Sequence, residues 1–325
     1  MPRMARSNRF EVDLHAAEAL RQMPPGPALL AGIDKALGHA SGLVIAPAAR
    51  AIVAHRLDGF DAALRTALDR LYVDPGDRDP QCRGKLALIS ALDELGCGEA
   101  ELFLRAARYV QMEPVWGSSQ DSAPPLRIRA AQALVRLGHH GLYRLLGELL
   151  TDLVGEVRGA AAQMLGAIGG ERAALLLRLR LVVGDADVDV LADYAAALLA
   201  CEGAEAVPLV VPLLRHDDRA VVGGIALALG GSRLPEALDP LRALLRQTAD
   251  RQLCRTLIDA IALQRSEAAA ETLLGLLTDS DAEQAMAAVK GLRLYRDRPA
   301  IAARVQAGVD SRRDGRLVQA WSQAG

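Results

Sequence analysis

The residue types that most often carry catalysis are scattered along this sequence. The four cysteines form no C-x-x-C pair and have no histidines at metal-ligand spacing; they are Cys82, Cys97, Cys201 and Cys254. The six histidines contain no H-E-x-x-H motif, and no G-x-S-x-G or Walker-type glycine loop is present. The sequence therefore predicts no metal and no cofactor. It favours a non-catalytic protein whose thiols stay reduced in the cytoplasm.

The segment 110–125, VQMEPVWGSSQDSAPP, has a composition suited to recognition. It contains one of the two tryptophans of the chain, next to a glycine and close to a proline. A tryptophan held in this way is a typical anchor of a protein-protein contact. We select four residues of the segment as candidate binding residues: Gln111, Glu113, Trp116 and Asp121.

Two interpretations of this segment remain open. In the first, Trp116 faces a partner, and Arg127 and Arg129 at the start of the next helix pair with the two carboxylates. In the second, Trp116 folds back over the adjacent helix pair, while Asp121 caps the following helix and pairs with Arg127.

Arginines recur on the second helix of successive units and form a further candidate site. Those selected as binding residues are Arg144, Arg178, Arg215 and Arg242. If the second helices are the inner ones, these side chains line a concave surface that would receive an acidic peptide or a phosphorylated ligand. The competing interpretation is that each arginine solvates an apolar helix and interacts with the negative end of its dipole.

The elements that must position these residues come from an internal repeat. The stretch 126–138 (LRIRAAQALVRLG) matches 157–169 (VRGAAAQMLGAIG), with leucine, glutamine and glycine at equivalent positions. The repeated leucine continues at near-equal spacing along the chain: Leu134, Leu165, Leu198, Leu229, Ile261 and Leu292. We expect all six to be buried between helices. A match of residues 91–96 to 133–138 adds Leu92, and weaker matches add Ile52 and Leu20.

Each unit has the punctuation of a helical hairpin, here taken as an outer helix, a tight turn and an inner helix. In the unit that starts near residue 217, Asp217 and Asp218 can cap the first helix and Gly230 and Gly231 can end it. Pro235 then opens the second helix, where a missing N–H costs little. The predicted fold is all-α: a right-handed α-solenoid of stacked antiparallel helix pairs, with about nine repeats.

The regularity of the repeats suggests three segments. Residues 1–78 form degenerate units, and the stretch 74–80 (DPGDRDP) follows as a joint. Residues 79–309 form the regular array, in which 110–125 is an inserted loop. Residues 310–325 cap the last apolar face or form a tail. Insertions in solenoids commonly project from the binding face.

Composition agrees with packed helices and gives no global charge. Apolar residues make up 51% of the 325 residues, but aromatic residues only 3%, and the formal net charge is -2. This charge creates no field that would attract nucleic acid or an anionic membrane. The longest apolar runs are interrupted by glycines and are shorter than the roughly 18 residues needed to cross a bilayer.

The units resemble HEAT repeats, in particular the short repeats of the phycobilin-lyase type. The resemblance rests on V-R-x-x-A-A at residues 157–162, on A-L-G-G at 228–231 and on A-x-x-x-L-x-x-L-L at 237–245. It implies a scaffold or adaptor that binds another protein or peptide, with an acidic one favoured by the arginines. The alternative that it implies is a bilin-lyase-like enzyme or enzyme subunit. A HEAT-like nucleic-acid-binding function is disfavoured, because aromatic residues are few and no basic groove is evident.

Overall fold

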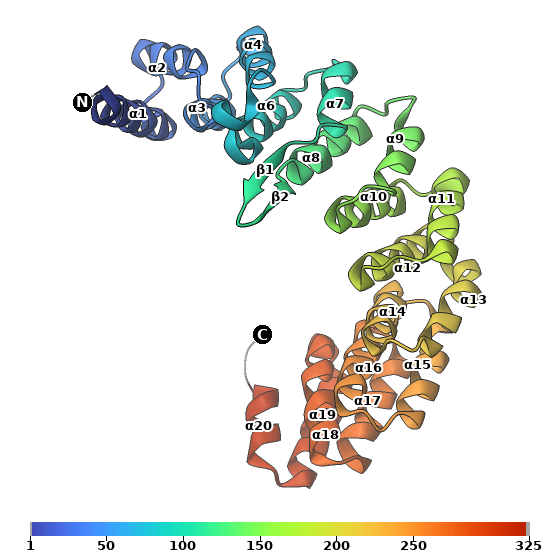
Figure 1. Cartoon of the computed structure of the whole chain (residues 1–325). Coiled ribbons are helices and arrows are strands. Elements are labelled where there is room, and N and C mark those ends of the chain that lie inside the picture. The colour runs from blue at the N-terminus through green and yellow to red at the C-terminus, as the bar shows by residue number, and fades with distance from the viewer. Residues whose placement is uncertain (1, 323–325) are drawn as a thin grey trace. The chain divides into compact units, whose positions relative to one another are not determined.

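The computed structural model describes the chain from residue 2 to residue 322, with side chains from residue 9 onward. The chain divides into two compact units, residues 1–148 and 149–325. Both are built from helix pairs (Figure 1). Unit 1 contains α1 (Pro2–Ala19), η1 (Leu20–Gln22), α2 (Pro27–Leu37), α3 (Gly42–Ala54), α4 (Asp61–Leu71), α5 (Pro75–Arg78), η2 (Pro80–Cys82), α6 (Arg83–Glu94), α7 (Ala100–Ala107), β1 (Met112–Val115), β2 (Ser118–Asp121), α8 (Pro124–Arg136) and most of α9 (Leu142–Leu149).

Unit 2 continues the same alternation of first and second helices. Its elements are α10 (Gly155–Ile168), α11 (Gly170–Val183), α12 (Val188–Glu202), η3 (Gly203–Ala206), α13 (Val207–Val210), η4 (Val211–Arg215), α14 (Arg219–Ser232), α15 (Pro235–Gln247), α16 (Arg251–Leu263), α17 (Glu267–Asp279), α18 (Ala282–Leu292), η5 (Arg293–Tyr295), α19 (Pro299–Arg312) and α20 (Gly315–Ser322). Over the described residues this arrangement is an all-α solenoid of helix pairs, interrupted only by the hairpin β1–β2.

The first helices of the pairs form the closely packed layer of each unit. In unit 2, α10, α12, α14, α16 and α18 pack successively against one another. Among the adjacent second helices of this unit, α17 and α19 also pack together, whereas α11, α13 and α15 touch the next second helix little. A curved stack is most crowded on its inner side, so the first helices are the inner ones. The expectation that the second helices form the inner layer is therefore wrong.

Small residues on the first helices explain the close approach. A Cβ atom added to Gly230 of α14 would lie only 2.2 Å from the carbonyl oxygen of Ala260 on α16, and one added to Gly166 of α10 would lie 3.0 Å from Ala197. Since the interior is packed to crystal density, larger residues at these positions would separate the helices. Helix α14 continues through Gly230 and Gly231 to Ser232, so the helix end expected at these glycines is wrong.

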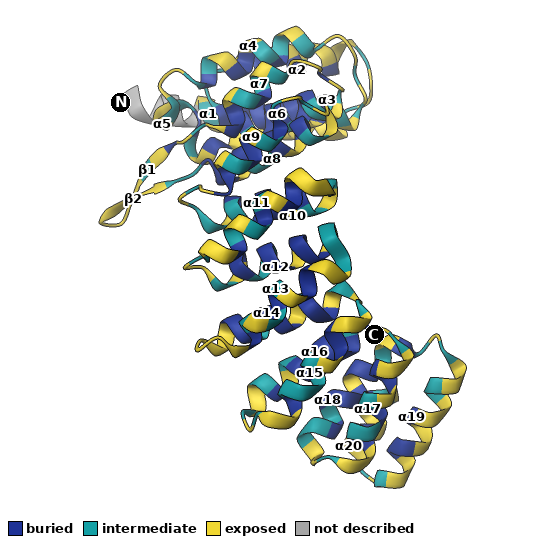
Figure 2. Cartoon of the chain, turned by 90° about the vertical axis from the view of Figure 1, so that its right-hand side faces the viewer, coloured by how far each residue is buried: buried dark blue, intermediate teal, exposed yellow. Residues whose placement is uncertain are grey.

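The six aliphatic positions predicted to be buried are buried, and so are the three earlier equivalents. All nine lie on or directly after a first helix, and none exposes more than 2% of its surface: Leu20, Ile52, Leu92, Leu134, Leu165, Leu198, Leu229, Ile261 and Leu292. Figure 2 shows the buried residues in dark blue along the helix faces that meet other helices. The register read from the sequence is therefore confirmed.

Aspartates cap four consecutive first helices of unit 2. The side chains of Asp187, Asp218, Asp250 and Asp281 each accept a hydrogen bond from a backbone N–H in the first turn of α12, α14, α16 or α18. Each cap satisfies donors that the helix itself leaves unpaired. The predicted cap at Asp218 and the predicted start of α15 at Pro235 are both confirmed.

One stretch, Val188–Arg215, is long and apolar enough to span a membrane by length and composition alone. In the structure it is a helix pair. The chain turns at Gly203, where φ is +60°, and α12 packs between α10 and α14. The apolar residues of this stretch therefore take part in helix packing within unit 2.

Candidate functional site

The insertion folds into an antiparallel hairpin. Met112 pairs with Asp121 and Val115 with Ser118, so that Trp116 and Gly117 form a two-residue turn. Gly117 adopts a φ of +72°, a conformation that glycine enters without strain. Trp116 at the tip is fully exposed, with 105% of its reference surface accessible, and the hairpin projects from its unit (Figure 2). The folded-back position of Trp116, one of the two interpretations of the sequence, is not observed.

A buried ion pair lies under the base of the hairpin. Lys85 and Asp79 are both fully buried, and Lys85 Nζ lies 2.9 Å from Asp79 Oδ2. The Asp79 carboxylate also accepts hydrogen bonds from the backbone N–H groups of Gly84 (2.6 Å) and Lys85 (3.0 Å). Lys85 Nζ donates a further bond to Gln111 Oε1 (2.9 Å). Removal of two charges from water is costly, and these bonds offset the cost only in this one geometry.

Gln111 connects the ion pair to the first strand. Its amide donates to the carbonyl oxygen of Asp79 (2.8 Å) and to Glu113 Oε1 (2.6 Å), while the Tyr109 hydroxyl donates to Gln111 Oε1 (3.0 Å). Only 4% of the Gln111 surface is exposed. The residue is therefore a structural link, out of direct reach of a partner.

Glu113 holds the hairpin to the segment that precedes α6. Its Oε1 accepts bonds from the backbone N–H of Gln81 (2.6 Å) and from the Ser122 hydroxyl (2.7 Å). Burial by itself raises the pKa of Glu113, but these hydrogen bonds and the one from Gln111 stabilise the charged form, so that the pKa lies below its ordinary value. Gln81 and Cys82 adopt left-handed φ values of 59° and 53°, which are unfavourable for residues with a Cβ atom.

Asp121 and Arg127 close the other end of the hairpin. Arg127 Nη1 donates to Asp121 Oδ2 (2.6 Å) and to the carbonyl oxygen of Tyr109 (3.0 Å), and Arg127 is 2% exposed. Asp121 Oδ1 accepts bonds from the N–H groups of Ala123 (3.0 Å) and Gln111 (3.1 Å). Burial raises the pKa of Asp121, but these bonds outweigh it and lower the pKa. The ion pair of the second interpretation is thus present, but the cap is not: the N-cap of α8 is Ala123, and no side chain caps this helix.

Arg129 does not pair with the hairpin. Its guanidinium lies 3.0 Å from Asp93 and 3.3 Å from Glu94, both on α6. Glu113 is held by the neutral donors described above. The expected pairing of both hairpin carboxylates with arginines is therefore correct for Asp121 only.

Two tyrosines complete the base around Lys85. The rings of Tyr72 and Tyr109 meet edge to face at 4.9 Å, and Lys85 Nζ lies 5.8 Å and 5.2 Å from their centroids. An ammonium group at this distance from aromatic faces gains cation-π attraction. Burial raises the pKa of both tyrosines, that of Tyr109 to about 12, so both hydroxyl groups stay protonated at physiological pH.

The four selected arginines lie on the second helices, outside the closely packed layer: Arg144 on α9, Arg178 on α11, Arg215 in η4 and Arg242 on α15. Two are held within the protein. Arg178 forms a two-pronged pair with Glu202, and Arg242 donates to the Thr272 hydroxyl (2.8 Å) and the Ala268 carbonyl (2.6 Å). The arrangement does not form a basic stripe on the inner layer. The positions of these arginines agree better with the competing interpretation, in which each arginine solvates its own apolar helix.

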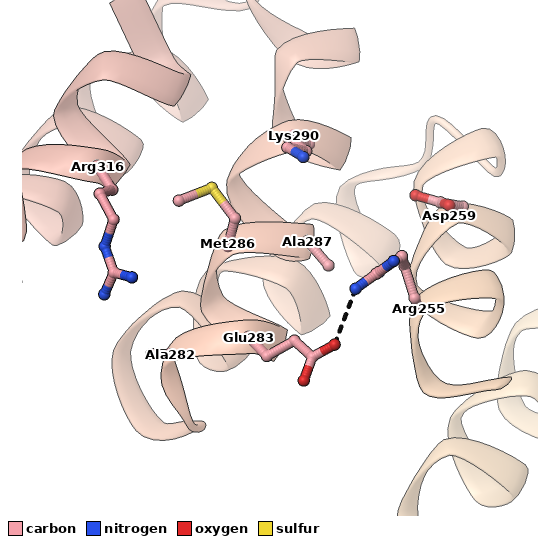
Figure 3. A pocket seen from close by; sticks show the side chains of 8 residues that line it. All are labelled: Arg255, Asp259, Ala282, Glu283, Met286, Ala287, Lys290 and Arg316. Atoms are coloured by element: carbon pink, nitrogen blue, oxygen red, sulfur yellow. Dashed lines mark hydrogen bonds and ion pairs between the residues drawn. The ribbon is translucent and has the colours of Figure 1, made fainter. Parts of the chain in front are cut away.

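An open pocket of about 600 Å³ lies on the first-helix layer of unit 2 (Figure 3). Three helices, α16, α18 and α20, contribute its lining: Arg255, Asp259, Ala282, Glu283, Met286, Ala287, Lys290 and Arg316. Arg255 Nη2 donates to Glu283 Oε1 (2.8 Å), and burial raises the pKa of Asp259. The pocket therefore carries charges of both signs and does not select one sign of ligand.

The sequence contains a signal for this pocket that was missed. Counted back from the ladder, Gly159, Ala192 and Gly223 occupy one equivalent position on α10, α12 and α14. In the next two repeats the same position holds Arg255 and Met286. The change from small to long side chains marks the repeats that line the pocket. Among the residues that the structure describes, no three histidine, cysteine or carboxylate side chains gather as a metal site.

The stacked pairs define the class of the protein as a helical-repeat scaffold. The family model for HEAT repeats matches residues 115–188 and 177–256 of this chain. No curated protein gives a significant match to the sequence.

Two of the solved structures that match the chain are the following. The complex of CpcE and CpcF of phycocyanin lyase from Nostoc sp. PCC7120 is 21% identical and has a TM-score of 0.39, with 76% of this chain and 94% of that chain covered. An engineered protein is 20% identical, also with a TM-score of 0.39, and 96% of this chain and 95% of that chain are covered.

Proposed function

We propose that this protein is a non-catalytic scaffold that binds another protein through the hairpin β1–β2, with Trp116 as the anchor. The observation that carries the proposal is the full exposure of Trp116 at the tip of a hairpin whose base is fixed by buried hydrogen bonds and two ion pairs. An exposed tryptophan keeps a large apolar surface in water. It recovers free energy when it enters a pocket of a partner.

The fixed base supports this role because it lowers the entropy that binding must offset. A flexible loop loses conformational freedom when it docks, whereas a preorganised hairpin has already lost it. The partner that suits this tip presents an apolar pocket for the indole, with polar groups at the rim for Ser118, Ser119 and Gln120, which are exposed on β2. The proposal favours the hairpin over the arginines of the second helices, because Arg178 and Arg242 already bind groups of their own chain.

The proposed setting is the cytoplasm, without a membrane or nucleic acid. Two observations support it: the four cysteines are free thiols, three of them buried, and the net charge of -2 provides no attraction for polyanions. The exposed side chains of Arg144 and Arg215 favour an acidic partner.

The test is a binding titration with the full chain. A partner is captured from cell extract, identified, purified and titrated against wild type, Trp116→Ala and Val12→Ala. Val12 is a matched control because it is an apolar side chain with 60% exposure outside the hairpin. We expect Trp116→Ala to cost about 2 kcal/mol or more, a loss of about 30-fold in affinity, as is typical of an anchor residue.

Equal affinities of wild type and Trp116→Ala would refute the hairpin as the binding element. Co-purification of a pigment, or turnover with one, would instead favour the bilin-lyase-like alternative. Melting curves of both variants establish that they are folded.

A further inference from the structure

The hydrogen-bond pattern of the hairpin β1–β2 determines which of its main-chain groups point outward. At the base, the N–H of Ser122 donates to the carbonyl oxygen of Gln111 (2.9 Å). In an antiparallel pair, residues that bond to the opposite strand alternate with residues whose N–H and C=O groups point away from it. The register is continuous up to the turn, so the alternation identifies four residues with outward main-chain groups: Met112 and Pro114 on β1, and Ser119 and Asp121 on β2.

The two edges of the hairpin differ in their ability to pair. On β1, Pro114 occupies an outward position and has no N–H to donate, which is one of the ways in which proteins block a strand edge. On β2, Ser119 and Asp121 both keep their N–H groups. In the part of the chain that the structure describes, the main-chain groups of these two residues bind no other group of the protein. The edge of β2 is therefore open, whereas the edge of β1 is blocked at Pro114.

The edge of β2 also lacks the other features that keep strands apart. Exposed edges are commonly protected by a lysine, by a bulge or by an inward-pointing charge. The register of residues 118–121 with β1 has no bulge, and their one charged side chain, that of Asp121, already pairs with Arg127 at 2.6 Å. Residues 118–120 are exposed and uncharged, on a hairpin that projects from its unit (Figure 2). An approaching strand therefore meets no free charge on this edge.

An extended segment of another protein is the occupant that fits this edge. Donors and acceptors on every second residue match the main chain of a strand, whereas a helix satisfies its main-chain groups internally. A second copy of this chain could pair β2 with β2, but the side chains that would meet are serine, glutamine and aspartate. Such a contact buries little apolar surface and is far smaller than a stable dimer interface. A partner that also accepts Trp116 adds the apolar contribution that the edge lacks.

We propose that the partner of this protein adds an extended segment as a third strand along the outer edge of β2. The inference rests on the proposed function, in which the hairpin is the binding element and Trp116 its anchor, and it specifies the form of the partner. The added strand pairs with Ser119 and Asp121 through about four main-chain hydrogen bonds, two for each residue, and has no proline opposite them. The fixed base of the hairpin holds this edge in the extended form before the partner arrives.

The first test removes one main-chain donor from the edge. Ser119→Pro deletes the outward N–H and keeps the bonds between β1 and β2, in which this group takes no part. Ser119→Ala is the matched control, because it deletes only the hydroxyl, which donates to the Glu113 carbonyl oxygen (3.3 Å), and keeps the N–H. Both full-length variants are titrated with the purified partner of the Trp116 experiment. Ser119→Pro is expected to lose about fivefold or more in affinity, and Ser119→Ala less than about twofold.

The second test uses wild type alone and so does not depend on the folding of Ser119→Pro. Overlapping synthetic peptides of about 12 residues, longer than a typical strand, cover the sequence of the purified partner and are titrated against the full chain. One region of the partner is expected to bind as a free peptide. N-methylation of the residues whose N–H groups face β2 should abolish its binding, whereas N-methylation of the residues between them should not.

The outcomes separate this inference from the proposed function. Equal affinities of wild type and Ser119→Pro, an equal loss in Ser119→Ala, or a bound peptide that tolerates N-methylation at every residue would overturn the strand addition. If the intact partner binds through Trp116 but none of its peptides binds, the partner presents a folded surface, and the inference fails while the proposed function stands. A dimer of the free chain that Ser119→Pro dissociates in sedimentation velocity would show that a second copy occupies the edge, and would overturn the inference as well.

Discussion

The hairpin base of unit 1 and the helix stack of unit 2 keep their parts in place by opposite means. The stack relies on aliphatic side chains and on glycines that let helices approach. The base of the hairpin instead buries a carboxylate, an ammonium group and an amide, and each donor meets a specific acceptor. Apolar packing contributes stability in proportion to the area buried, whereas a buried polar network permits only one geometry. The molecule uses the polar network at the point where a binding element must be held rigid.

The largest expected effect comes from a substitution in the buried polar network under the hairpin. Lys85→Met keeps the length of the side chain but leaves the Asp79 carboxylate buried without its counter-charge. The free energy of unfolding should fall by about 3–5 kcal/mol, the usual cost of breaking a buried pair. Urea unfolding measures the loss. The matched control is Lys35→Met, because Lys35 pairs with Asp13 but is 73% exposed, and the expected loss there is below about 1 kcal/mol. Similar losses of unfolding free energy for the two variants would mean that the buried Lys85–Asp79 pair stabilises the protein no more than an exposed pair does.

The next prediction tests the apolar packing of the helix stack. Leu165 is fully buried on α10, and Leu165→Ala should lower the free energy of unfolding by about 2–5 kcal/mol through lost burial and a residual cavity. Leu175→Ala on the outer face of α11 removes the same atoms from an exposed site. Leu175→Ala should therefore change the free energy of unfolding by less than about 0.5 kcal/mol. A loss below about 1 kcal/mol for Leu165→Ala would mean that the register of the repeats is wrong.

These two regions also differ in how well the sequence predicts them. The ladder is a local signal repeated nine times, so its burial, the aspartate cap at residue 218 and the helix start at residue 235 could be inferred. The inner and outer layers could not be assigned, because both helices of a pair carry leucine and arginine. The layers are distinguished instead by backbone approach, as at Gly230 and Ala260.

The hairpin base could be predicted only in part. Its location and the pair of Asp121 with Arg127 follow from a break in the repeat and from a short spacing. The strands were not foreseen, because SSQD has no apolar alternation. The central contacts join Asp79, Lys85 and Gln111 across up to 32 residues of sequence, and neither Asp79 nor Lys85 belongs to a motif. Pairings of this kind depend on tertiary structure, and periodicity carries no information about them.

A third prediction refines the comparison within the stack. Gly230→Ala introduces a methyl group 2.2 Å from the backbone oxygen of Ala260, which can move only if two helices separate. Overpacking of this type should cost about 1–3 kcal/mol. The adjacent Gly231 has no atom within 4 Å of an added Cβ, so Gly231→Ala should stabilise α14 by about 0.5–1 kcal/mol through reduced backbone entropy. Thermal unfolding of the two variants should therefore shift in opposite directions, and shifts of equal sign would argue against the close contact of α14 with α16.

The last prediction concerns a buried carboxylate of the stack that is held by hydrogen bonds, as Asp79 is at the base of the hairpin. Asp185, between α11 and α12, is almost fully buried and accepts hydrogen bonds from Arg158 (2.8 and 2.6 Å), Arg180 (3.1 Å) and the Tyr194 hydroxyl (3.0 Å). Burial by itself raises the pKa of Asp185, but the hydrogen bonds from Arg158, the Asp187 N–H and Tyr194 lower it to about 2.

Because the folded-state pKa of Asp185 is below the unfolded value, its contribution is complete above about pH 4 and is lost as the pH falls toward 2. A shift of this size corresponds to about 2 kcal/mol. Asp185→Asn should therefore lower the stability at neutral pH and flatten its decline between about pH 4 and 2, since the amide has no proton to gain. Asp239→Asn is the control, because Asp239 is 88% exposed beside Arg242 and should leave the acid limb unchanged. If the two variants had the same acid limb, the anchoring of the α11–α12 loop would have to come from packing and not from the charge of Asp185.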